Sequence, residues 1–448
     1  MEKKYHTNHV IIICLFISVL SFLLQAPVLS QDMQQLIDEK YPGLEELYQH
    51  LHSNPELSLQ EENTAKRMSA ELQRLGFTVT ERVGGYGVVG VFQNGPGPTV
   101  MVRSDMDALP IQEQTGAEFA STKRAILPGG DESYVMHACG HDLHMTAMIG
   151  TASVLTSLRE NWSGTLIMIA QPAEEIGAGA QAMIDDGLFE RFPRPDYALA
   201  LHVNSALESG KVGIVPGYVY ASVDEIRITV KGRGGHGAYP DLTVDPVVMA
   251  SKLVLDLQTI ISREISTFEQ AVLSVGSIRS GSSFNIIPDE AELRLTLRTY
   301  KSEVREKIIR RVREMADAAG KAAGLPEDEW PDVQVGDEPL PSVYNSPVLA
   351  DKMLETFSDL IGNENVFQLS PVMYGEDFGM YGRVSPKIPI LIYGLGAVAP
   401  DQMEKYEQGL IDVLPSTHSS RFLPDYEPAI KTGVLTMTNA VIRLMDNN

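Results

Sequence analysis

The sequence has few cysteines and few positive charges, and each shortage excludes a class of protein. Only two cysteines occur in 448 residues, so no framework of disulfides can hold the fold together. Lysine and arginine number 36 against 59 aspartates and glutamates, which gives a formal net charge of -23 at pH 7. Nucleic acids and anionic membrane surfaces both attract clustered Lys and Arg. The composition therefore argues against both kinds of partner.

Long apolar runs are also missing, except at the N-terminus. Two lysines precede an apolar run from Val10 to Leu24, and small residues at spacing two follow it, up to Ser30. This order is typical of a secretory signal peptide, and the run is short for a spanning helix, which needs about 20 residues. We predict a signal peptide at residues 1–30 and an exported mature protein, periplasmic or secreted, that does not associate with a membrane. An uncleaved anchor is the alternative.

Apolar residues make up 44% of the chain, enough for large cores. An amphipathic helix is expected over Glu61–Leu75. Short apolar runs between helical patterns favour a mostly parallel sheet that is covered on both faces. The expected strands are Thr99–Val102, Thr165–Ala170, Tyr197–Val203 and Ile388–Tyr393.

The middle of the chain has a different pattern, in the order βαββαβ, which is typical of a compact α+β unit. Its strands are expected at 225–230, 272–278, 291–298 and 333–335, and its helices at 245–262 and 302–323. The α/β pattern then resumes. We therefore predict an α/β protein in which a catalytic domain (31–220 and 337–448) is interrupted by an inserted unit (221–336).

Residues with metal-binding and acid–base chemistry follow the expected strands or lie in loops. Asp105 and Asp107 follow the first strand, Glu174 and Glu175 the second, and His202 ends the third. Ligands in open α/β sheets collect at this edge. Further donors lie in the loop His137–His144 and at His418.

Cysteine, histidine and carboxylate are the donor set of zinc and similar ions. A lone cysteine such as Cys139 is more often simply buried, and His137 and His144 are interpreted as ordinary surface residues of a loop or helix face. Paired acids are usually solvated, but Glu174 and Glu175 follow a core strand. One can therefore bind metal while the other acts as general base.

A nicotinamide enzyme is a competing interpretation, because Gly232–Gly237 fits the G-x-G-x-x-G pattern after a strand. No helix is expected to open on the last glycine, so a phosphate would lack a helix N-terminus.

Together the motifs resemble the co-catalytic dinuclear-metal peptidase and amidohydrolase family, in particular its aminoacylase, hippurate hydrolase and auxin-conjugate amidohydrolase branch. The resemblance spans almost the whole mature chain, with the motifs in the family's order. It rests on RSDMDALP (103–110), MHACGHDLH (136–144), QPAEE (171–175), GGHGAYP (234–240), FNIIPD (284–289), GEDF (375–378) and HSSRF (418–422).

The resemblance implies two divalent metal ions, with zinc expected and manganese, nickel or cobalt as alternatives. Cys139 would bridge both ions, His141 and His202 would complete one site, and Glu175 and His418 the other. Glu174 would be the general acid/base and Asp107 its supporting carboxylate, while Asp105 is not expected to bind metal. The inserted unit would be a lid and dimerisation domain, in which His236 and Asn285 reach the substrate.

The function implied by the resemblance is hydrolysis of the amide bond of N-acyl amino acids by metal-activated water, in a homodimer joined through the lid. A carboxypeptidase or dipeptidase acting on small peptides is the alternative. A non-catalytic metal-binding descendant of the family is a further alternative, although such a protein would be expected to have lost Glu174.

Overall fold

The computed structural model describes residues 6–336 and 339–446, and of residues 6–29 it describes the backbone only. The side chains of residues 1–29 of the predicted signal peptide therefore lie outside the described part, and export stays a prediction. No helix among the described residues has the length and apolarity needed to cross a membrane.

The chain forms two compact units. The first contains residues 1–214, 348–369 and 388–448, and the second contains residues 215–347 and 370–387. The predicted insertion, 221–336, lies inside the second unit. Residues 370–387, which we predicted to belong to the catalytic domain, also cluster with this unit. The lid and dimerisation roles of this unit stay predictions.

The first unit is built on an eight-stranded sheet in which four of the seven strand pairs are parallel. The prediction of a mostly parallel α/β sheet is confirmed. In spatial order the strands are β1 (Thr78–Val83), β2 (Gly87–Asn94), β6 (Gly164–Gln171), β3 (Thr99–Asp105), β7 (Tyr197–Glu208), β18 (Ile390–Val398), β8 (Val212–Ile214) and β17 (Val366–Gln368).

Helices pack on this sheet through one large apolar core. The expected amphipathic helix is α2, which buries Ala65, Met68 and Leu72. Phe357 of α8 packs against Tyr393 of β18, with ring centroids 5.1 Å apart. The helices that the first unit contains or shares are α1 (His6–Ser53), α2 (Glu62–Arg74), α3 (His141–Ser157), α4 (Gly179–Asp185), α5 (Leu188–Arg191), α8 (Pro347–Ile361), α9 (Pro400–Glu407) and α10 (Tyr426–Met445).

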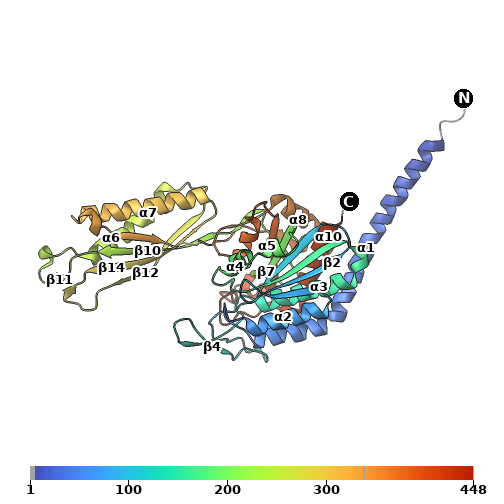
Figure 1. Cartoon of the computed structure of the whole chain (residues 1–448), viewed down its shortest axis with the longest axis horizontal. Helices are drawn as coiled ribbons and strands as arrows, with labels where there is room; N and C mark the ends of the chain where they lie inside the picture. Colours follow the sequence, from blue (N-terminus) through green and yellow to red (C-terminus); the bar gives the residue numbers. More distant parts are fainter. Residues whose placement is uncertain (1–5, 337–338, 447–448) are drawn as a thin grey trace. The chain divides into compact units, whose positions relative to one another are not determined.

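The second unit has the βαββαβ order that the sequence predicted. Its antiparallel sheet has the spatial order β12 (Ala271–Ser280), β14 (Glu290–Thr299), β10 (Ser222–Lys231) and β15 (Asp332–Val335). The helices α6 (Pro246–Thr259) and α7 (Ser302–Ala322) pack side by side on this sheet, as Figure 1 shows. Every second residue of β14 is buried, from Ala291 to Leu297, and faces this core.

Short two-stranded pairs complete the chain. They are β4 (Arg124–Ile126) with β5 (Glu132–Tyr134), β9 (Gly217–Tyr220) with β16 (Val343–Asn345), and β11 (Gly235–His236) with β13 (Ile286–Ile287). The strand β11, and not a helix, follows the glycines at 232–235, so the structure lacks the phosphate-binding turn of a nicotinamide enzyme at this point.

Candidate metal centre

Three parallel neighbours of the first unit, β6, β3 and β7, bring the predicted motifs to one edge of the sheet. Asp105 ends β3, Glu174 and Glu175 follow β6, and His202 lies within β7. Because the carboxyl ends of parallel strands share an edge, residues nearly one hundred positions apart meet there.

All five predicted metal ligands meet at this edge. Each of two groups, both containing Cys139, has its donor atoms within 4.8 Å of one another. In the first, Cys139 Sγ lies 3.5 Å from His202 Nε2, and His141 is the third member. In the second, His418 Nε2 lies 3.4 Å from Glu175 Oε2. The two groups have the composition that the family resemblance implies for two ion sites.

Two backbone features hold these donors in place. Gly140 caps α3 with φ 77°, and a Cβ there would lie 2.7 Å from Val203 Cγ2, so glycine is required between Cys139 and His141. His418 has φ 66°, and its N–H donates to the carbonyl of Ala138 at 2.8 Å. The late loop is thereby fastened to the Cys139 loop.

The tautomer of His141 suits metal binding. Its Nδ1 donates to the backbone carbonyl of Asp107 at 2.8 Å, which leaves a lone pair on Nε2. This Nε2 and Glu175 Oε1 are both buried, have no hydrogen-bond partner within the described residues, and lie 3.8 Å apart. A pair of buried, unpartnered atoms of this kind is unfavourable unless a proton on Nε2 or a metal ion between them satisfies both. Thiolate, imidazole and carboxylate therefore fit a zinc-like ion here.

The electrostatics of the centre also favour a cation. Burial lowers the pKa of His141, but the carboxylates of Asp105, Glu175 and Asp107 outweigh burial and raise it to about 10. Burial raises the pKa of Glu175 to about 7, against the attraction of His141. The excess negative charge that would protonate the imidazole would equally attract a divalent ion.

Asp107 fixes the turn that contains both acids. Its Oδ1 accepts the N–H of Glu174 at 3.1 Å, and its Oδ2 accepts the N–H of Glu175 at 3.0 Å. Ser58 Oγ donates to the same Oδ2 at 2.6 Å. Glu174 is 8% exposed, with Oε2 3.8 Å from His141 Nε2. This geometry suits a general base that stands beside the ligands.

The interpretation of His137 and His144 as surface residues is wrong, because each is only 2% exposed. His137 has no hydrogen-bond partner for either ring nitrogen among the described residues, and burial lowers its pKa to about 4. A loop whose side chains converge on a metal centre is itself buried. The many polar residues of MHACGHDLH suggested an exposed loop instead.

His144 and Asp105 have donor atoms close to His141, but they are already engaged. His144 Nε2 accepts the N–H of Val203 at 2.9 Å, so Nδ1 is protonated and donates to Asp105 at 2.7 Å. The other oxygen of Asp105 pairs with Arg103 at 2.7 Å. These hydrogen bonds fix the backbone next to His202. They also occupy both ring nitrogens of His144, which leaves no lone pair for a metal.

The predicted lid residues lie in the second unit. His236 is on β11, and Asn285 directly precedes β13, its pairing strand. The N–H of Gly237 donates to the carbonyl of Asn285 at 2.8 Å. This pairing brings the two residues close together within the second unit, and both side chains are exposed.

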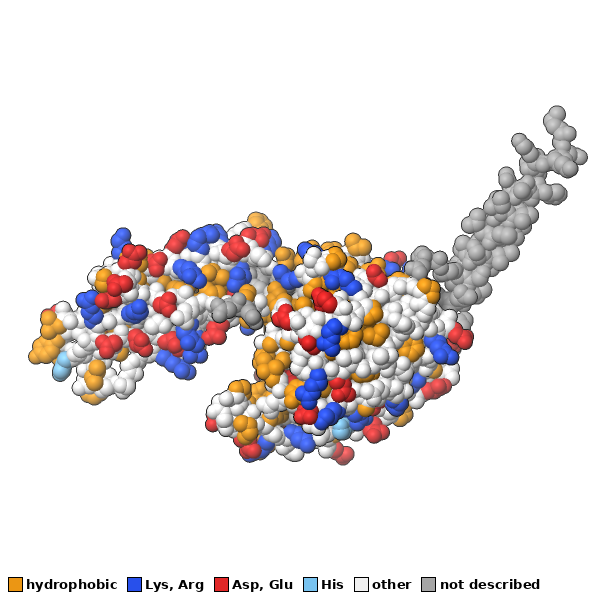
Figure 2. Space-filling model, viewed as in Figure 1, with side chains coloured by type: hydrophobic (Ala, Val, Ile, Leu, Met, Phe, Trp, Pro, Cys, Tyr) orange, Lys and Arg blue, Asp and Glu red, His pale blue; other side chains and the backbone are white. Residues whose placement is uncertain are grey.

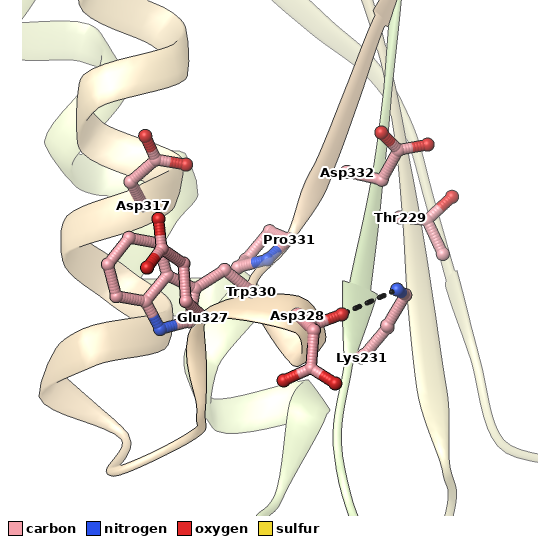
Figure 3. Close-up of a pocket in the computed structure, with 8 residues that line it drawn as sticks. All are labelled: Thr229, Lys231, Asp317, Glu327, Asp328, Trp330, Pro331 and Asp332. Carbon is pink, nitrogen blue, oxygen red and sulfur yellow. Dashed lines mark hydrogen bonds between the residues drawn. The ribbon is translucent and has the colours of Figure 1, made fainter.

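A separate pocket of the second unit lies between α7, β10 and β15 (Figure 3). Carboxylates predominate in it, and Lys231 Nζ donates to the carbonyl of Asp328 at 3.4 Å. None of the predicted site residues lines it. Its lining residues are Thr229, Lys231, Asp317, Glu327, Asp328, Trp330, Pro331 and Asp332.

An α/β sheet whose edge gathers thiol, imidazole and carboxylate donors beside a further carboxylate defines the class of metal-dependent hydrolases. The comparison of the sequence with known families agrees. The chain belongs to peptidase family M20/M25/M40, whose model matches residues 101–420.

Individual relatives include amidohydrolases and peptidases. The chain is 36% identical over 340 residues to hippurate hydrolase of Campylobacter jejuni, covering 75% of this chain and 84% of the relative. It is 34% identical over 389 residues to thermostable carboxypeptidase 2 of Saccharolobus solfataricus, covering 86% and 91%. A dinuclear metal-binding M20 peptidase from Bacillus subtilis superposes with a TM-score of 0.72 at 28% identity, covering 91% of this chain and 99% of that one.

Proposed function

We propose that this hydrolase cleaves the amide bond of N-acyl amino acids, with Glu174 as general base. The observation that supports this most is the place of Glu174, buried beside the ligand groups on a turn whose amides Asp107 holds. The similarity to hippurate hydrolase favours an acylated amino acid as substrate.

Divalent ions at this centre would polarise the amide carbonyl and lower the pKa of attacking water toward about 7. Glu174 takes the proton of that water and passes it to the leaving nitrogen. In this proposal His236 stabilises the oxyanion, and one such donor lowers the activation free energy by about 3 kcal/mol. Asn285 contacts the substrate.

We propose two ions, held by Cys139 with His141 and His202, and by Cys139 with Glu175 and His418. Zinc suits the thiolate and imidazoles best, and manganese, nickel and cobalt tolerate similar donors. The shared Cys139 in both groups of converging donors and the dinuclear relative support this number.

We also propose export and a homodimer joined through the second unit. The edge strand β12 has one neighbour in the described sheet, and α6 exposes Val247, Val248 and Leu255. Figure 2 shows further apolar side chains at the end of this unit where β11 is drawn in Figure 1. A free edge beside exposed apolar residues favours pairing with a second copy.

The deciding experiment is metal analysis of the purified protein together with a panel of N-acyl amino acids and dipeptides. We expect about two ions per chain and turnover of the acylated substrates, whereas preference for dipeptides would favour the carboxypeptidase or dipeptidase alternative. Glu174→Gln should keep its metal and lose at least about 100-fold in kcat. Glu160→Gln, an exposed acid of the same unit, is the control and should behave as wild type. Near wild-type kcat in Glu174→Gln would contradict the assigned role.

A further inference from the structure

A second buried carboxylate, that of Glu61, lies against the turn with the two acids. Glu61 is 0% exposed, and its Oε1 accepts the backbone N–H of Ala173 at 2.8 Å, from 112 positions earlier in the chain. It directly precedes α2, yet its side chain makes no capping hydrogen bond to that helix. The contact to Ala173 instead joins it to the turn with the two acids.

Glu61 and Asp107 together bind three consecutive amides. The N–H of Ala173 goes to Glu61, and those of Glu174 and Glu175 go to the two oxygens of Asp107. Successive N–H groups that point the same way form an anion-binding concavity. In this protein the concavity is filled by two of its own carboxylates.

The backbone of this turn is strained. Ala173 has φ 54°, a left-handed conformation that costs a residue with a Cβ about 1 kcal/mol. Its carbonyl accepts the N–H groups of Ala178 and Gly179, each at 3.1 Å. Such a conformation persists only where surrounding contacts fix it, and the Glu61 bond is one of them.

Stability alone does not account for Glu61. Its Oε2 is buried without a hydrogen-bond partner within the described residues. Burial together with Asp107 raises the pKa of Glu61 to about 7, although hydrogen bonds from nearby backbone N–H groups oppose the rise. A carboxyl group that is desolvated and close to another carboxylate is costly to bury. An acid at such a place indicates a requirement other than stability.

We propose that Glu61 is a positioning residue that fixes the backbone from Ala173 to Glu175 and so aims the general base and its neighbouring ligand. This inference rests on the proposed function for the roles of Glu174 and Glu175. The position of the turn itself follows from geometry alone, and it can be measured separately.

The test compares Glu61→Leu, which lacks the acceptor, with Glu61→Gln, which keeps an oxygen at the same place. Glu62→Gln, the adjacent and more exposed acid, is the matched control. Hydrogen exchange of the peptide that covers residues 172–179 should quicken at least tenfold in Glu61→Leu and stay near wild type in the other two variants. In turnover of N-acyl amino acids, Glu61→Leu should lose about 10- to 100-fold in kcat with KM within about threefold.

Each outcome has a defined meaning. Unchanged exchange at residues 172–179, or wild-type kcat in folded Glu61→Leu, would overturn the proposal and leave Glu61 a packing residue. So would a Glu61→Gln variant as impaired as Glu61→Leu, because the acceptor is present there. If wild type neither binds zinc nor hydrolyses the panel, the proposed function fails, and local loosening in Glu61→Leu alone would still support the positioning role.

Discussion

His144 donates a hydrogen bond from Nδ1 to Oδ1 of Asp105 across 2.7 Å, and both side chains are buried. Through its other nitrogen the same ring holds the backbone of Val203, next to His202. One imidazole thus connects α3 with the end of β3 and with the middle of β7, beside the ligand His202.

We expect His144→Leu to weaken zinc binding by about 10- to 100-fold, because the backbone beside His202 loses its support. The unpaired N–H of Val203 should lower the free energy of unfolding by about 1–3 kcal/mol. Zinc titration and urea unfolding measure the two effects. Ser153→Ala on the same helix is the control, and wild-type zinc affinity in His144→Leu would contradict the role.

His52, at the end of α1, should make stability fall at alkaline pH. Burial lowers its pKa, but contacts with Asp142 at 2.6 Å and Glu113 at 3.0 Å outweigh burial and raise it to about 9. The folded state thus binds this proton more tightly than the unfolded state, whose pKa is about 6.5. The contribution is complete below about pH 6.5 and is lost as the pH rises through about 9.

We expect that loss to reach about 3 kcal/mol in the free energy of unfolding between pH 6.5 and 9.5. Urea unfolding of wild type and of His52→Gln at a series of pH values isolates it, because other groups titrate in both proteins. A difference between the two curves that stays constant across this range would refute the assignment.

Gly179→Ala should destabilise the protein through a backbone collision. An added Cβ would lie 1.6 Å from the carbonyl oxygen of Pro172, in the turn after β6. Neither group belongs to a flexible side chain, so the turn must shift, and we expect a loss of about 3 kcal/mol or more together with most activity. Thermal unfolding checks this against Gly129→Ala, where nothing lies within 4 Å and stability should be unchanged.

Removal of metal should lower stability as well as activity. Without an ion His141 Nε2 and Glu175 Oε1 stay buried 3.8 Å apart with no hydrogen-bond partner among the described residues, and the carboxylates around them lose a divalent counter-charge. Zinc at 1,000 times its dissociation constant should restore about 4 kcal/mol to the chelator-treated protein. Thermal unfolding with and without zinc measures this shift, and Cys139→Ser should lose most of it. Equal shifts in both proteins would point to ions bound elsewhere.

Periodicity and residue order in the sequence predicted the helices and strands. They did not predict contacts between residues that are far apart in the chain. The alternation of residues 291–298 specified β14, and apolar runs such as 197–203 specified strands of the sheet, because burial on one or both faces leaves a local pattern. Ser58 and Glu61 leave no such pattern. They follow a helix in an irregular segment, and only folding brings them to Asp107 and Ala173. His144 was misjudged because burial of a polar ring depends on partners that arrive from β3 and β7.

The place of β18 between β7 and β8 has a consequence for biosynthesis. A ribosome that has reached residue 214 has made both neighbours of this strand, while β18 itself follows the whole second unit and begins at Ile390. The nascent sheet therefore lacks the strand between β7 and β8 for roughly 10 to 30 s at ordinary elongation rates. Unpaired strand edges of this kind are prone to aggregation, and the metal centre cannot be complete until His418, which follows β18, has been made.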